Sequence, residues 1–138
     1  MPITADSFEL FRRKQQLRQL EEKLQSRAAE TREEIVRRIV EADEQEEVEK
    51  KIGEQMRDFF RDSTRIAAAV FSTLHQKRTD EIEMRLEQEV AGFFDDTKAA
   101  ALQVLSQLKQ GSTTAPKALD SLLQDRARRL ARVAATGN

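Results

Sequence analysis

Apolar side chains recur every three or four residues along most of the chain, a spacing that places them on one face of an α-helix. The first stripe predicts a helix over residues 6–42, with Asp6 and Glu9 at the spacing of an N-terminal cap. Its apolar or small positions are Leu17, Leu20, Leu24, Ala28, Thr31, Ile35, Ile39 and Ala42.

Two further stripes predict helices over residues 43–77 and 80–110. Shifting the chain by 34 residues lays 47–76 on 81–110 with ten identical positions, which include Phe59 on Phe93 and Phe60 on Phe94. We interpret this likeness as an internal duplication. Each copy contains one helix, which separates it from arrays that repeat a helix-turn-helix unit.

The sequence signals for the turns between these helices differ in strength. Asp43 and Glu46 repeat the capping spacing and favour a turn there, but nothing in residues 41–47 forbids one continuous helix. Asp80 and Glu83 predict the start of the third helix, and Gly111 predicts its end.

The last part of the chain differs in composition from the rest. Residues 112–116 are small and polar and predict a linker. Residues 117–138 carry five basic and two acidic side chains and predict a basic amphipathic tail, with its apolar positions at Leu119, Leu122, Leu123, Leu130 and Val133. This tail could dock outward on a partner or fold back onto residues 1–111.

These elements predict an all-α protein: an elongated antiparallel three-helix bundle or coiled coil with a short C-terminal amphipathic helix. Its core is expected to contain Phe59, Phe60, Phe93 and Phe94. A turn near residue 78 would place Phe59 opposite Thr97 and Phe93 opposite Ser63. A turn near residue 43 would place Ala28 and Ala29 beside that layer and Phe11 beside His75. The alternative is the same helices associating between chains, and we expect a homodimer.

Composition supports the helical interpretation and narrows the chemistry. About half of the residues are Ala, Glu, Lys, Leu or Arg, and only 4 Gly and 2 Pro interrupt them, so a sheet protein is excluded. With no Cys and one His, neither a metal site nor a cofactor is expected. Asp62, Asp95 and Asp96 could act as paired acids, but we interpret them as acids flanking the apolar stripe. His75 could sense pH, although ending a helix is its simpler role.

No nucleophile motif or phosphate-binding loop occurs, so we expect no enzymatic activity. The interpretation is a cytoplasmic scaffold or adaptor that binds another protein. The alternative is an amphipathic-helix protein on a lipid or hydrophobic particle surface, for which an anionic membrane would suit the basic tail. Nucleic acid is disfavoured because residues 1–116 are acidic and Trp and Tyr are absent. The predicted partner-binding residues are Leu122, Leu123, Arg128, Arg129, Leu130 and Arg132.

Overall fold

Every regular element in the described part of the chain is an α-helix. The computed structural model describes residues 5–39, 42, 44–75 and 77–136. The helices are α1 (Ala5–Ile39), α2 (Gln45–His75), α3 (Thr79–Lys109) and α4 (Ala115–Thr136). No strand occurs in these ranges. The prediction of an all-α protein is therefore confirmed.

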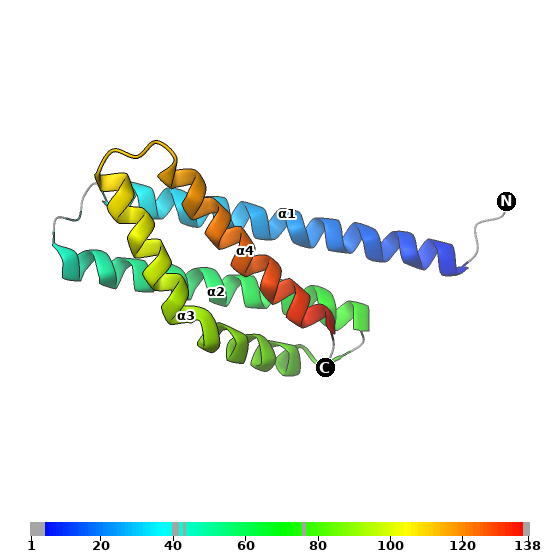
Figure 1. Cartoon of the computed structure of the whole chain (residues 1–138). Helices are drawn as coiled ribbons and strands as arrows, with labels where there is room; N and C mark the ends of the chain where they lie inside the picture. Colours follow the sequence, from blue (N-terminus) through cyan, green and yellow to red (C-terminus); the bar gives the residue numbers. More distant parts are fainter. Residues whose placement is uncertain (1–4, 40–41, 43, 76, 137–138) are drawn as a thin grey trace.

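Helices α1, α2 and α3 form successive contacts in an antiparallel arrangement (Figure 1). Because α1 ends at Ile39 and α2 begins at Gln45 beside it, the continuous helix considered from the sequence does not form. The predicted cap at Asp43 lies outside the described residues. Two glutamates in the first turn of α2, Glu46 and Glu47, face the positive end of the helix dipole.

The predicted end of α3 agrees with the structure, whereas the residue predicted to cap its start does not. Arg78, with extended backbone, precedes the helix, so Asp80 lies in the first turn and not at the predicted cap. There its carboxylate accepts a hydrogen bond from the Glu81 N–H at 3.1 Å. At the other end Gly111 adopts a φ of 89°, which favours glycine. Its N–H donates to the Leu108 carbonyl at 3.0 Å, and the predicted end of this helix is confirmed.

The C-terminal segment is a full helix of the bundle. Helix α4 has 22 residues and begins within the predicted 112–116 linker, with Pro116 in its first turn where no donor is needed. It contacts α1, α2 and α3, so four helices surround the core where three were expected (Figure 1). Of the two arrangements left open for the tail, folding back is the one observed. The buried stripe that fixes it is Ala115, Leu119, Leu123, Ala127, Leu130 and Ala134.

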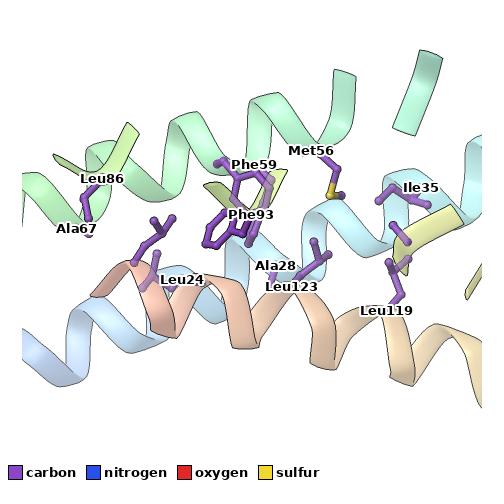
Figure 2. Packing of buried hydrophobic residues seen from close by; sticks show 14 of the residues in the cluster. Leu24, Ala28, Ile35, Met56, Phe59, Ala67, Leu86, Phe93, Leu119 and Leu123 are labelled. Atoms are coloured by element: carbon purple, nitrogen blue, oxygen red, sulfur yellow. The ribbon is translucent and has the colours of Figure 1, made fainter. Parts of the chain in front are cut away.

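An aromatic layer lies at the centre of the bundle. Phe59, Phe60 and Phe93 are almost fully buried, and Phe94 is half-buried at their edge. The Phe60 ring centroid lies 5.4 Å from that of Phe59 and 5.1 Å from that of Phe93. Figure 2 shows Phe59 and Phe93 between α2 and α4, with Ala28 of α1 at the same level. A small residue is found where the rings need room, as predicted.

The aromatic residues of α2 and α3 meet in one layer, as predicted. The Phe60 ring centroid lies 5.1 Å from that of Phe93 and 6.2 Å from that of Phe94. The connection between the two helices is short, since α2 ends at His75 and α3 begins at Thr79.

The first half of α1 projects beyond the other helices (Figure 1). Four of the five exposed large apolar side chains among the described residues lie here: Phe8, Leu10 and Phe11 are 58–59% exposed, and Leu17 is 42% exposed. The fifth, Met84 of α3, is 61% exposed. From Leu20 to Ile35 the stripe of α1 is buried. Phe11 was expected beside His75; it is exposed instead, and the His75 side chain is not among the described ones.

Candidate partner-binding groove

A groove of about 430 Å³ runs between α1 and α4, with Phe71 of α2 also lining it. The apolar residues from the two flanking helices are Leu17, Leu20, Leu24, Ala127 and Ala131. The polar residues along it are Glu21, Gln25, Gln124, Asp125, Arg128 and Arg132. Apolar residues with charged neighbours make this groove a candidate binding site.

The groove exists because α4 presents small residues where α1 presents large ones. Ala127 and Ala131 line it from α4, whereas Leu17, Leu20 and Leu24 line it from α1. An alanine side chain cannot fill the space opposite a leucine, so the two helices leave a hollow along their contact. Leu17 is still 42% exposed at the end where α1 leaves the bundle.

Two arginines of α4 bind α3 and hold the helix in place. The Arg126 Nε donates to the Thr97 Oγ1 at 2.8 Å, and the Arg129 Nε donates to the Glu89 Oε1 at 2.6 Å. Both guanidinium groups also lie over the Phe93 ring, at 5.6 and 5.3 Å from its centroid, within cation–π range. These contacts join α4 to the aromatic layer.

Two other arginines of α4 remain available to a ligand. Arg128 and Arg132 are exposed and line the groove. Within the described residues neither of them forms an ion pair or a side-chain hydrogen bond. They are the positive groups of the groove, beside an acidic residue, Asp125, that already pairs with Arg126 at 2.9 Å.

The structure therefore divides the six residues predicted to bind a partner. Leu123 and Leu130 are fully buried in the core, Leu122 is half-buried against it, and Arg129 is bound to Glu89. In this fold the two buried leucines cannot form an outward docking surface, because their side chains already pack inside the bundle. Only Arg128 and Arg132 face the groove.

The acidic residues singled out from the sequence do not form a paired site. Asp62 binds Arg27, whose Nε lies 2.9 Å from Oδ2, and Arg27 also donates to the Thr31 Oγ1 at 2.8 Å. Asp95 and Asp96 are exposed on α3. In the described parts of the chain, no group of three or more His, Cys, Asp or Glu side chains could hold a metal ion. The Arg37 hydrogen bond lowers the pKa of Glu34 from its usual value, but Glu34 lies outside the groove.

Sequence reasoning missed the groove because it joins two helices that are about a hundred residues apart in the chain. A signal was nevertheless present: Ala115, Ala127 and Ala134 complete a stripe at helical spacing along the tail. Counting only large side chains made the tail look short. None of the described helices combines the length and apolar character needed to cross a bilayer.

Comparisons with protein-family models, with curated proteins and with solved structures each give no match to this chain.

Proposed function

We propose that the protein is a non-enzymatic helical scaffold subunit that binds an amphipathic helix of another protein in the α1–α4 groove. The observation that supports this proposal is the combination of apolar lining residues with two exposed guanidinium groups that have no partner in the described chain. An amphipathic helix lays its apolar face into such a groove. Glutamates beside that face would pair with Arg128 and Arg132.

The rest of the fold suits a scaffold. Four helices of 35, 31, 31 and 22 residues form a long body around the central aromatic layer. Phe60 and Phe94 of this layer line a second groove of about 360 Å³ between α2 and α3. Arg27 and Arg126 form contacts between neighbouring helices, so both residues have a structural role. Binding at an outer groove would leave this body unchanged.

A lipid or hydrophobic particle surface is the second candidate, and one observation favours it. The first half of α1 exposes Phe8, Leu10 and Phe11 beside the basic Arg12 and Arg13. Aromatic and basic residues on one short helix are typical of segments that lie in a membrane interface. The concave shape of the α1–α4 groove favours a helix over a flat surface.

A defined peptide tests the groove. The probe is a fluorescent amphipathic peptide of about five helical turns, with leucines at helical spacing and glutamates beside them. We expect fluorescence anisotropy to rise with protein concentration, and the charge reversal R128E/R132E to weaken binding about tenfold or more. A peptide with lysines in place of the glutamates should not bind.

The matched control is R57E/R65E. Arg57 and Arg65 are exposed arginines of α2 that line a different groove, so this variant makes the same change in net charge elsewhere. It should bind the acidic peptide like the wild type. Equal binding by R128E/R132E and the wild type, or no binding by the wild type, would contradict the proposed function.

A further inference from the structure

The groove between α2 and α3 shares no lining residue with the α1–α4 groove. Its volume of about 360 Å³ is in the range of sites that hold small molecules. Its apolar lining residues are Phe60 of α2 and Val90 and Phe94 of α3. The Phe60 and Phe94 rings meet edge to face, with centroids 6.2 Å apart. This α2–α3 groove therefore offers an aromatic surface against which a further ring can pack.

One end of the α2–α3 groove is basic. Arg57 of α2 lines it, and Lys98 of α3 lies beside Arg57 over Gly53. The Lys98 Nζ and the Arg57 Nη2 lie 3.7 and 3.8 Å from the point that a Cβ atom at Gly53 would occupy. Within the described residues neither cation forms an ion pair or a side-chain hydrogen bond. Two positive groups held close together without a counterion favour the binding of an anion.

The other end carries a hydroxyl group without a partner. Thr64 lines the groove and is only 4% exposed, and its side chain forms no hydrogen bond within the described residues. It lies seven residues after Arg57, which is two turns along the same side of α2 and a separation of about 10 Å. A buried hydroxyl group normally has a hydrogen-bond partner, so a ligand in the groove can supply the one that is missing here.

From these features we infer that the α2–α3 groove binds a small aromatic carboxylate with a hydroxyl group at its far end. The carboxylate accepts hydrogen bonds from the Arg57 guanidinium and the Lys98 ammonium. The ring packs against Val90 and Phe94, and the hydroxyl group forms a hydrogen bond with Thr64. Because this site lies outside the α1–α4 groove, the inference does not depend on the proposed function.

The charges at the Thr64 end limit the ligand to one carboxylate. Glu83 and Glu87 of α3 line this end, since α2 and α3 are antiparallel (Figure 1). Neither forms an ion pair within the described residues, and Arg65, next to Thr64 in the chain, offsets only one of the two charges. A second carboxylate would be repelled here, whereas a phenolic hydroxyl group can donate to Glu87 as well as to Thr64.

Isothermal titration calorimetry with four related compounds tests the site. The probe is 4-hydroxyphenylpropanoate, whose ring and three-carbon chain span the distance between the two ends. We expect one molecule to bind per chain with a Kd below about 1 mM. The amide of the probe, which is uncharged, should bind about tenfold more weakly or worse. Phenylpropanoate and 4-carboxyphenylpropanoate should each bind about three- to tenfold more weakly than the probe. No saturable binding of the probe, or equal binding of its amide, would overturn the inference.

Single substitutions assign the two ends of the ligand. R57Q should weaken binding of the probe about tenfold and change that of its amide little. T64V, which keeps the size of the side chain, should weaken the probe about three- to tenfold and leave phenylpropanoate unchanged. The matched control is R61Q, because Arg61 lines the same groove but pairs with Asp58 and Asp62 at 3.3 and 3.5 Å. It should bind the probe like the wild type. If T64V weakened the probe and phenylpropanoate equally, the contact with Thr64 would be wrong.

The two charge-reversed variants separate this site from the proposed function. R57E/R65E should lose the probe and keep the acidic peptide, whereas R128E/R132E should lose the peptide and keep the probe. Equal loss of the probe in both variants would show a general attraction of anions and would overturn the site. A wild type that binds the probe and not the peptide would overturn the proposed function alone, and one that binds the peptide and not the probe would overturn this inference alone.

Discussion

Helix α4 carries two pairs of arginines that differ in what they contact. Arg126 and Arg129 bind Thr97 and Glu89 of α3, whereas Arg128 and Arg132 line the α1–α4 groove without an ion pair in the described chain. The pairs separate in space because successive residues of an α-helix are rotated by about 100°. The basic tail therefore has two sides: one contacts the bundle, and the other lines the α1–α4 groove.

The same division runs through the leucines of α4. Leu123 is fully buried beside Ala28 (Figure 2), whereas its neighbour Leu122 is half-buried. Leu123→Ala should lower the free energy of unfolding by about 2–5 kcal/mol, since it leaves a cavity in the core. Leu122→Ala should cost about 1 kcal/mol. Urea unfolding followed by circular dichroism measures both, and similar small losses for the two would mean that α4 does not pack as described.

The inward arginine Arg126 should contribute less than a core leucine but more than a surface charge. Its side chain is only 21% exposed, and removing it takes away the hydrogen bond to Thr97 and the contact with the Phe93 ring. We expect Arg126→Ala to lower the free energy of unfolding by about 1–3 kcal/mol.

A double-mutant cycle with Thr97→Val isolates that hydrogen bond. The two substitutions should be coupled by about 1 kcal/mol because they remove the same contact. Arg129→Ala is the comparison: the side chains of Arg129 and Glu89 are 46% and 28% exposed, so its loss should be smaller and should shrink at high salt. Additive effects of Arg126→Ala and Thr97→Val would contradict the contact.

These same residues show which features of the structure could be predicted from the sequence. Spacing at three and four residues predicted helices, the burial of Phe59, Phe60 and Phe93, and the end of α3 at Gly111, because these depend on local geometry. It left open whether α4 docks outward or folds back. The apolar side of an amphipathic helix must pack against another surface in either arrangement, and hydrophobic periodicity does not identify that surface.

The contacts that hold α4 against the bundle join distant parts of the chain. Arg126 and Thr97 are 29 residues apart, and Arg129 and Glu89 are 40 residues apart. No pattern in the sequence indicates either of these contacts. The groove depends on a still longer separation, between Leu17 of α1 and Arg132 of α4, and its hollow depends on Ala127 and Ala131, which a search for large apolar residues passes over.

The outward pair should have the smallest effect on stability and the clearest effect on binding. Arg128 and Arg132 are exposed and have no ion pair in the described chain, so R128A/R132A should change the free energy of unfolding by no more than about 0.5 kcal/mol. The same variant should weaken binding of the acidic peptide severalfold, because the groove loses its positive charge. Urea unfolding and fluorescence anisotropy on one preparation separate the two effects. A loss of stability as large as that of Arg126→Ala would mean that the outward arginines also hold the bundle, and the division of α4 into a joining side and a binding side would then be wrong.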